Sequence, residues 1–316
     1  MTARAWAELL RVSALFTVPG DALAGAAAVG RRPNRSTALA VGASLCLYEA
    51  GMALNDWADR EEDAVDRPHR PIPSGRITPR AALTAAGALT AAGLALAARA
   101  GRPALTVATG LAATVWAYDL RLKHTPAGPA AMAAARGLDL LLGATATATA
   151  TAHATTAPAK ASAAATATAT ARSAVPAALP AAALLTAHTY AVTAVSRHEA
   201  QGGSTTAPLA ALTAVAALGV VTARDRPGEG KRASAPAQLL VTALTGAYLR
   251  TAGRPLAHAA LNPSPPLTQR AVGGGIRAMI PLQAALAARA GASGTALAVM
   301  GLVPLARSLA RKVSPT

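Results

Sequence analysis

Residues 55–63 read Asn-Asp-Trp-Ala-Asp-Arg-Glu-Glu-Asp and directly follow an apolar run over residues 38–54. The chain has only 14 acidic residues in 316, and six of them fall between Asp56 and Asp66. If this segment is helical, Asp56, Asp59 and Asp63 are spaced i, i+3 and i+7 and project from one helix face. Three like charges on one face repel each other unless a cation lies between them.

These carboxylates predict a metal site. Hard oxygen ligands favour Mg²⁺, which shares its coordination shell with water and with substrate phosphates. Ionisable groups at the end of a membrane helix indicate a functional site. The alternative is a solvated acidic helix end, where the acids only complement a helix N-terminus. The spacing of the aspartates and the apolar run before them favour the metal site.

The composition is typical of a membrane protein. Hydrophobic residues make up 53% of the chain and charged residues 14%, which is unusual for a soluble domain of this size. Several apolar runs have about the ~20 residues that span a bilayer, and their Ala and Gly content suits close helix packing in lipid. The runs cover residues 12–30, 37–54, 81–98, 103–118, 129–147, 175–195, 206–222, 235–249, 271–288 and 291–308.

We therefore expect an all-α, multi-pass transmembrane bundle of about nine helices, nine or ten by the count of runs. The run at 235–249 or at 271–288 could instead lie in the membrane interface or re-enter the membrane. A soluble, alanine-rich helical protein is the alternative to the membrane bundle. Cys46 stands alone in the second span, so no disulfide can form within the chain, and it is expected to pack as a small residue.

The net charge of +16 comes from 26 arginines and only 4 lysines. Such an excess occurs in nucleic-acid-binding proteins, but there the cations gather into one patch. Here they punctuate the apolar runs, as do residues that flank a membrane and meet anionic lipid. We therefore expect membrane lipid, and no nucleic acid, among the partners. The cations divide about equally between the two predicted faces, so the positive-inside rule does not set the orientation.

Residues 144–172 have a different composition from the rest of the chain. They consist mainly of Ala-Thr repeats around His153, Lys160 and Arg172, without apolar periodicity. We expect a loop insertion here, disordered or partly helical at its edges, within a single domain that covers residues 1–316. At the N-terminus, Pro19-Gly20-Asp21 interrupts the first apolar stretch, which favours a retained first helix over a cleaved signal peptide.

The acidic segment is part of a longer motif, which we call the first motif, and another motif lies further along the chain. Residues 55–63 fit the pattern Asn-Asp-x-x-Asp-x-x-x-Asp, and residues 66–76 continue as Asp-Arg-Pro-His-Arg-Pro-Ile-Pro-Ser-Gly-Arg. Residues 118–125 read Tyr-Asp-Leu-Arg-Leu-Lys-His-Thr. Both segments resemble motifs of the UbiA-type intramembrane prenyltransferases, and residues 11–21, 195–203 and 275–283 resemble the EboC-like branch of that family. The resemblance covers nearly the whole chain except residues 144–172.

This resemblance implies a Mg²⁺-dependent transfer of a prenyl group from a prenyl diphosphate to an acceptor. Cations would stabilise the leaving diphosphate while the allylic C–O bond breaks. The motifs end the second, fourth and sixth spans, so they are expected on the same membrane face. The resemblance implies a cell-membrane location in which that face is cytoplasmic. The implied metal ligands are Asn55, Asp56, Asp59 and Asp63, and the implied diphosphate ligands are Lys123 and Arg197, with Arg67, Arg70 and Arg121 as further candidates.

Tyr118 has two interpretations. It would shield the carbocation-like fragment or contact the acceptor, or it would be an interfacial aromatic anchor. Arg136 and Asp139 lie at i and i+3 on the fifth span, where they would form a structural pair or line an acceptor pocket. His69, His124 and His198 border the site and are expected to be loop histidines rather than catalytic bases.

The second acidic motif departs from the family pattern. Family members carry a second aspartate motif after the sixth span, but residues 196–203 read Ser-Arg-His-Glu-Ala-Gln-Gly-Gly, which leaves Glu199 as the one carboxylate, a candidate substrate contact. Two interpretations follow. Either one Mg²⁺ suffices and Arg197 supplies the charge of the second metal, or catalysis is lost and the fold binds or transports a lipid or metabolite. The complete first motif favours a working enzyme.

Overall fold

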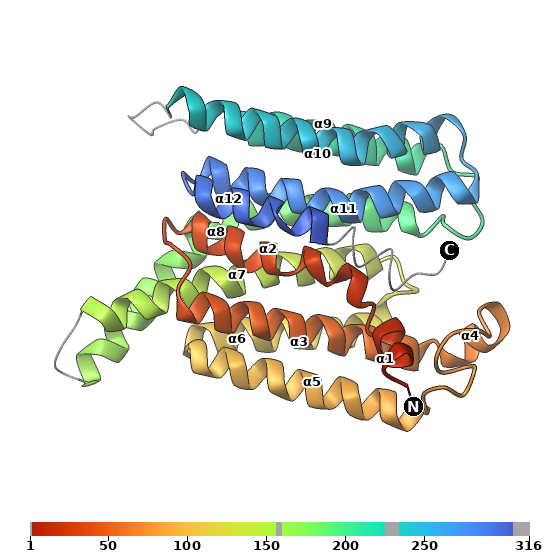
Figure 1. The fold of residues 1–316 in the computed structure, drawn as a ribbon, viewed down its shortest axis with the longest axis horizontal. Coiled ribbons are helices and arrows are strands. Elements are labelled where there is room, and N and C mark those ends of the chain that lie inside the picture. The colour runs from red at the N-terminus through yellow and green to blue at the C-terminus, as the bar shows by residue number, and fades with distance from the viewer. Residues whose placement is uncertain (1, 156–159, 225–233, 306–316) are drawn as a thin grey trace.

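The computed structural model of the protein describes residues 2–155, 160–224 and 234–305, and none of these residues is in a β-strand. Helices lie side by side along one direction and are joined by short connections (Figure 1). The elements are α1 (Ala3–Leu9), the 3₁₀ helix η1 (Val12–Thr17), α2 (Pro19–Ala28), α3 (Arg35–Ala58), α4 (Arg60–Asp66), α5 (Pro79–Ala100), α6 (Arg102–Ala117), the π-helical turn η2 (Tyr118–Leu122), α7 (Gly128–Thr155), α8 (Lys160–Ser196), α9 (Thr206–Ala223), α10 (Ala235–Leu261), α11 (Pro265–Arg289) and α12 (Ser293–Met300).

In the part of the chain that the structure describes, each of the ten apolar runs lies mainly in helix, and the run at 12–30 is divided between η1 and α2. This confirms the predicted all-α bundle. Within the described residues, α3, α5, the 173–196 part of α8, α9 and α11 are long and apolar enough to cross a membrane. The two runs that could have re-entered the membrane lie in α10 and α11, uninterrupted helices of 27 and 25 residues. At ~1.5 Å per residue, both helices are long enough to span the ~30 Å hydrocarbon core.

Helix starts follow from local sequence. Asn34 and Thr37 form a reciprocal capping box at the start of α3, which satisfies backbone N–H groups that have no partner within the helix. The Thr37 hydroxyl also hydrogen-bonds to the Thr147 hydroxyl over 2.8 Å, which joins α3 to α7. Gly101 turns the chain from α5 into α6 at φ 134°, a conformation that residues with a Cβ rarely adopt. These contacts fix where the helices that form the site begin.

The bundle interior is built largely from alanine. One buried cluster lies among α8, α9, α10 and α11 around Leu185, Tyr248 and Leu282. A second cluster lies among α3, α5, α6 and α7 around Leu47 and Leu142. Small side chains let helix backbones approach closely, which replaces the missing hydrophobic driving force between helices in lipid.

The backbones of α2 and α7 pack closely against each other. A Cβ added at Gly143 would lie 2.3 Å from the Cα of Ala22, and one added at Gly25 would lie 2.1 Å from the Leu140 carbonyl oxygen. We expect Gly143→Ala to lower the midpoint of thermal unfolding, because overpacking a close contact costs ~1–3 kcal/mol.

Thermal unfolding in detergent would measure this effect. Gly110→Ala is the control, because no atom outside its own helical turn lies within 4 Å of an added Cβ there. Alanine also favours helix more than glycine does, so Gly110→Ala should leave the midpoint unchanged or raise it. Equal midpoints for the two variants would contradict the close packing of α2 on α7.

The alanine- and threonine-rich segment differs from the expected loop. Its first residues, 144–149, are helical, as was allowed for the edges of the segment, but they are a buried part of α7 rather than part of an insertion outside the bundle. Residues 150–155 and 160–172 are also helical, whereas 156–159 lie outside the described residues. Alanine favours helix, and threonine hydroxyls such as those of Thr147 and Thr149 bond to the carbonyl one turn earlier. The ends of α7 and α8 extend past the neighbouring helices (Figure 1).

Candidate functional site

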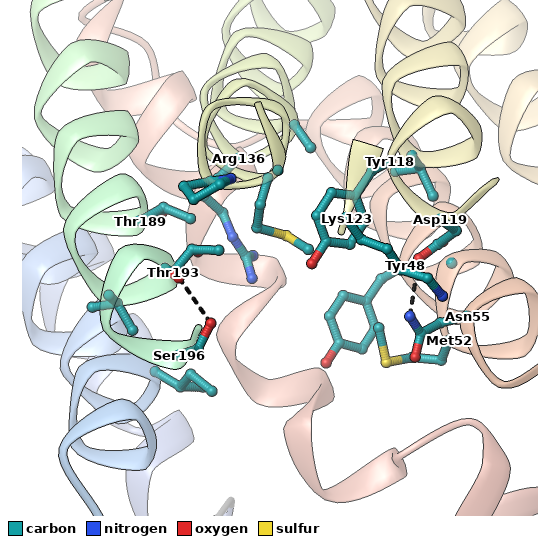
Figure 2. Close-up of a pocket in the computed structure, with 18 of the residues that line it drawn as sticks. Tyr48, Met52, Asn55, Tyr118, Asp119, Lys123, Arg136, Thr189, Thr193 and Ser196 are labelled. Carbon is teal, nitrogen blue, oxygen red and sulfur yellow. Dashed lines mark hydrogen bonds between the residues drawn. The ribbon is translucent and has the colours of Figure 1, made fainter. Parts of the chain in front are cut away.

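A cavity of about 620 Å³ lies among α3, α6, η2, α7, α8 and α11. The C-terminal ends of α3, η2 and α8 meet at one end of it, which we call the motif end. Figure 2 shows Asn55, Asp119 and Lys123 on one side of the cavity and Ser196 across from them. The structure therefore brings together segments that lie far apart in the sequence, each at the end of an even-numbered apolar run.

Most of the predicted site residues reach this cavity, but three do not line it. Asp56 and Asp63 are buried beside it, 5% and 1% exposed. Arg121 is exposed and lies outside the lining, because the π-helical turn directs Tyr118, Asp119 and Lys123 toward the cavity and leaves Arg121 outside. The predicted residues that do line it are Asn55, Asp59, Arg67, Arg70, Tyr118, Lys123, Arg197 and Glu199.

The three aspartates of the first motif do not share one helix face, so that expectation is wrong. Helix α3 ends at Ala58, and Asp59, with φ −87° and ψ 4°, separates it from α4. Asp56 and Asp63 both bind the Arg70 guanidinium, over 3.5 and 2.6 Å. Asp59 instead faces the cavity. The turn at Asp59 and the intervening arginine thus relieve the repulsion that a single acidic helix face would create.

Asp59 and Asn55 carry the polar chemistry of the cavity wall at the motif end. One Asp59 oxygen forms an ion pair with the Lys123 ammonium, whose side chain is only 9% exposed. The Asn55 side-chain amide donates to Asp119 Oδ1 over 3.2 Å (Figure 2). Because this bond uses the amide N–H, the Asn55 carbonyl oxygen remains available as a ligand. Asp119 lies between Tyr118 and Lys123 in the sequence, and its side chain is buried. It was not among the predicted site residues.

Arg11 is a second residue that the sequence did not single out. Its guanidinium binds Asp56 Oδ1 over 3.1 Å and lines the cavity. Arg11 is also the one non-glycine residue with positive φ, 49°, among the described residues, a strained conformation that clusters at functional sites. Glu8 of α1 pairs with Arg76 over 2.6 and 3.0 Å, and this contact holds the N-terminal segment beside the first motif.

The altered second motif forms the opposite wall of the motif end. Arg197 lines the cavity and donates to the Thr125 carbonyl over 2.8 Å. Glu199 also lines the cavity, and burial raises the pKa of its carboxyl group, with the Arg67 charge opposing the shift. His124 is exposed, and its imidazole lies 3.8 Å from Asp59. Arg197 and Glu199 therefore both face the space that the first motif borders.

The donor set at the motif end fits a hard divalent cation. Asn55 and Asp59 both line the cavity, and their side-chain oxygens are ligands that suit Mg²⁺. Arg70 pairs with both Asp56 and Asp63, so its guanidinium occupies the position between these two carboxylates where a metal ion would otherwise bind. Among the described residues, one group of acidic and histidine side chains gathers its ligand atoms within 4.8 Å, namely Asp59, Glu62 and His124 at the exposed rim.

The far end of the cavity is also polar. Arg136 of α7 pairs with Asp21 of α2 over 2.6 Å, and the Asp139 carboxylate accepts a hydrogen bond from the Ser44 hydroxyl. Arg136 and Asp139 both line the cavity. The sequence suggested that Arg136 and Asp139 either pair with each other within α7 or line an acceptor pocket. The structure gives Arg136 a partner on another helix, Asp21, and places both α7 residues in the wall.

Solved structures share this fold. A UbiA homologue from Archaeoglobus fulgidus bound to GPP and Mg²⁺ superposes with a TM-score of 0.58 at 20% identity, over 92% of this chain and 99% of the neighbour. The apo structure of a UbiA homologue from Aeropyrum pernix K1 gives a TM-score of 0.58 at 19% identity, over 83% of this chain and 96% of the neighbour. At these identities the likeness establishes the fold.

Sequence relatives point to the same family. The chain is 37% identical over 128 residues to digeranylgeranylglyceryl phosphate synthase of Methanopyrus kandleri, which covers 39% of this chain and 45% of the relative. It is 35% identical over 151 residues to the synthase of Halobacterium salinarum, which covers 46% and 54%. The chain thus spans about half the length of these relatives. The family profile matches residues 13–224, more than half of the chain, and the chain therefore belongs to the UbiA prenyltransferase family.

Proposed function

We propose that the protein transfers a prenyl group from a prenyl diphosphate to an acceptor with the help of Mg²⁺. One observation carries the proposal: a carboxylate and amide ligand set faces a group of cations at one end of an apolar cavity. The name of the A. fulgidus neighbour, bound to GPP and Mg²⁺, and the names of the synthase relatives support the same activity. The resemblance of the sequence motifs to the family supports a cell-membrane location with the site on the cytoplasmic side. It also supports membership of the EboC-like branch.

The charges at the motif end suit a diphosphate that arrives with a metal. Bound together, the two bring far less charge into a low-dielectric site than either would alone. The protein's own charges there are already balanced. Five acidic residues, Asp56, Asp59, Asp63, Asp119 and Glu199, lie close to five basic residues, Arg11, Arg67, Arg70, Lys123 and Arg197.

Each group has a role in this proposal. Asn55 and Asp59 would hold Mg²⁺ at the cavity wall, and Asp56 and Asp63 would join them where the cation takes the place of the Arg70 guanidinium. The bound Mg²⁺ would neutralise the leaving diphosphate. Lys123, Arg70 and Arg197 donate N–H groups to the diphosphate oxygens, where the arginine fork suits phosphate. As the allylic C–O bond breaks, the electron pair leaves with the diphosphate. The acceptor nucleophile then bonds to the allylic carbon and loses its proton.

The middle of the cavity suits the prenyl chain. Three of the five methionines of the chain, Met52, Met132 and Met279, line it together with Val115 and Ile276. Methionine is flexible and polarisable and adapts to an irregular apolar ligand. Such walls also exclude water, which would otherwise capture a carbocation-like fragment. Tyr118 lies at the boundary between this apolar wall and the motif end (Figure 2), which suits shielding of that fragment.

We propose a single-metal site in which Arg197 replaces the charge of a second metal. Arg197→Ala is then expected to weaken the binding of geranyl diphosphate in Mg²⁺ by about tenfold, the value of one charge-assisted hydrogen bond of ~1.5 kcal/mol. Glu199→Gln should change it less than twofold, because Glu199 is not a metal ligand in a single-metal site.

Equilibrium binding of geranyl diphosphate to both variants would measure these effects. Arg224→Ala is the matched control, because Arg224 ends α9 away from the cavity lining. A larger effect from Glu199 than from Arg197 would contradict the single-metal site, because Glu199 would then act as a metal ligand.

The proposed function is tested by turnover. Purified protein in detergent is incubated with Mg²⁺ and a panel of prenyl diphosphates and membrane lipid extract, and mass spectrometry follows diphosphate release and the prenylated products. We expect diphosphate release that depends on Mg²⁺ and a product heavier by one prenyl group. Lipid binding without diphosphate release would instead favour a UbiA-like protein that binds or transports a lipid or metabolite.

A further inference from the structure

The inner end of the cavity holds a polar cluster that the proposed reaction does not use. Asp21 of α2 is fully buried and accepts hydrogen bonds from Arg136 over 2.6 Å and from the Gln283 amide over 2.7 Å. Asp139 of α7 accepts a hydrogen bond from the Ser44 hydroxyl of α3. Four helices thus contribute polar side chains to one small region, which we call the inner cluster and define as Asp21, Ser44, Arg136, Asp139 and Gln283.

The inner cluster lies deep in the bundle. Ser44 precedes Asn55 by 11 residues on α3, which places it ~16 Å along the helix axis from the first motif. Arg136 lies 8 residues into α7, which begins at the motif end, or ~12 Å along its axis. Charged groups at such depth in a membrane helix are costly, and they mark substrate pathways more often than packing.

Helix packing alone does not account for this cluster. A structural ion pair would be closed on all sides, as Asp21 is, since it is buried and does not line the cavity. Arg136 and Asp139 both line the cavity. A guanidinium carries five N–H donors, and the bond to Asp21 engages only Nη1 of Arg136. Figure 2 shows the Arg136 side chain reaching into the cavity, and this side chain is 13% exposed.

The groups that face the cavity here define the chemistry of a ligand. Arg136 offers hydrogen-bond donors, and Asp139 beside it offers an acceptor. The Thr189 hydroxyl donates to the Leu185 carbonyl and keeps lone pairs for a ligand. His188 offers nothing, because its two ring nitrogens already bond to Tyr248 and to the Gly275 carbonyl. A hydroxyl or amide, which both donates and accepts, satisfies Arg136 and Asp139 together.

The charge of the inner cluster favours a neutral ligand over an anionic one. The inner cluster contains one cation, Arg136, and two carboxyl groups, Asp21 and Asp139, so it carries no net positive charge. An anion placed there would be desolvated without compensation, which is expensive in a low-dielectric interior. A neutral polar group escapes this cost and gains the hydrogen bonds.

We propose that the inner cluster is a subsite for the far end of the acceptor and that it selects a compact acceptor with a neutral hydroxyl or amide there over one with a carboxylate or phosphate. This inference rests on the proposed function, because the motif end must be filled by the prenyl diphosphate for the acceptor to lie beneath it. The acceptor nucleophile would then point toward the allylic carbon while its opposite end bonds to Arg136 and Asp139.

Two ring compounds of equal size test the selection. 4-Hydroxybenzyl alcohol and 4-hydroxybenzoate differ in a neutral hydroxyl against a carboxylate. Each is titrated into detergent-solubilised protein with Mg²⁺ and geranyl S-thiolodiphosphate, a donor that reacts very slowly, and binding is followed by calorimetry. We expect the alcohol to bind at least tenfold more tightly than the carboxylate. Binding of neither compound, or preference for the carboxylate, would overturn the inference.

Variants assign the preference to the inner cluster. Asp139→Asn keeps an acceptor for the Ser44 hydroxyl and removes one negative charge, so the preference for the alcohol should fall to threefold or less. Arg136→Lys keeps a cation for Asp21 but loses the fork, so binding of the alcohol should weaken about tenfold. An unchanged preference in Asp139→Asn would overturn the inference.

The affinity for geranyl S-thiolodiphosphate distinguishes a failure of the proposed function from a failure of the acceptor subsite. It should stay within twofold of the unaltered protein in both variants, because neither residue reaches the motif end. If the unaltered protein does not bind the thiolodiphosphate at all, the proposed function fails first. If it binds the thiolodiphosphate but neither ring compound, the proposed function stands and the acceptor subsite fails.

Discussion

Asp59→Asn is expected to lower Mg²⁺-dependent diphosphate release at least 100-fold. Asp59 is the aspartate of the first motif that lines the cavity. Its carboxylate is a proposed Mg²⁺ ligand and pairs with Lys123. Losing a charged metal ligand removes stabilisation of the leaving diphosphate, and each ~1.4 kcal/mol lost lowers the rate tenfold. Release of diphosphate from geranyl diphosphate, followed by a coupled assay, measures the effect.

Asp66→Asn is the matched control for Asp59→Asn. Asp66 ends α4, is exposed and does not line the cavity, so its loss changes the net charge by the same amount without touching the site. We expect its rate to stay within twofold of the unaltered protein. Equal losses in the two variants would show that overall charge, rather than the position of Asp59, governs the rate.

Arg70→Gln is expected to destabilise the metal-free protein by about 2–3 kcal/mol. Arg70 neutralises two buried carboxylates, Asp56 and Asp63. Breaking a buried ion pair costs ~3–5 kcal/mol because it leaves an uncompensated charge. The partial exposure of Arg70 and the remaining pairs with Arg11 and Arg67 reduce this cost. Thermal unfolding in detergent with a chelator measures the loss, and Mg²⁺ should restore part of it, because a bound cation replaces the guanidinium.

Two further variants isolate the cause. Adding Asp63→Asn to Arg70→Gln removes one of the two buried carboxylates that lost this partner, so the double variant should be more stable than Arg70→Gln alone. Arg60→Gln is the control, because Arg60 pairs with Glu61, which is 86% exposed, and surface pairs contribute ~0–1 kcal/mol. If Arg60→Gln and Arg70→Gln destabilise the protein equally, the buried pairs do not hold the first motif together.

Much of the fold was predictable because it follows from local patterns. Apolar runs of membrane length give helices, and helix ends on one face bring their motifs together. Local patterns also misled. The i, i+3, i+7 spacing assumed one continuous helix, but the chain turns at Asp59, and Asp56 and Asp63 share Arg70. Low sequence complexity suggested a loop at residues 144–149, although alanine and threonine form a buried part of α7 there.

The contacts that the sequence did not reveal are long-range ones. Arg11 meets Asp56 from 45 positions away, and Gln283 meets Asp21 from 262 positions away. No periodicity or spacing rule connects residues at such separations, and lone polar residues in apolar runs give no sign of their partners. Asp119 did carry a local signal, since it lies beside Tyr118 within the 118–125 motif, but only the structure shows that Asn55 donates to it.

The most direct test of the account is the metal dependence of donor binding. Geranyl S-thiolodiphosphate is titrated into the protein in lipid nanodiscs, with Mg²⁺ and with a chelator, and bound metal is counted. The account predicts saturable binding with one Mg²⁺ per protein. Binding should be at least 100-fold weaker in chelator, because the balanced charges of the protein then leave the charge of the diphosphate uncompensated in a low-dielectric site. Equally tight binding without a divalent cation, or no binding in Mg²⁺, would contradict it.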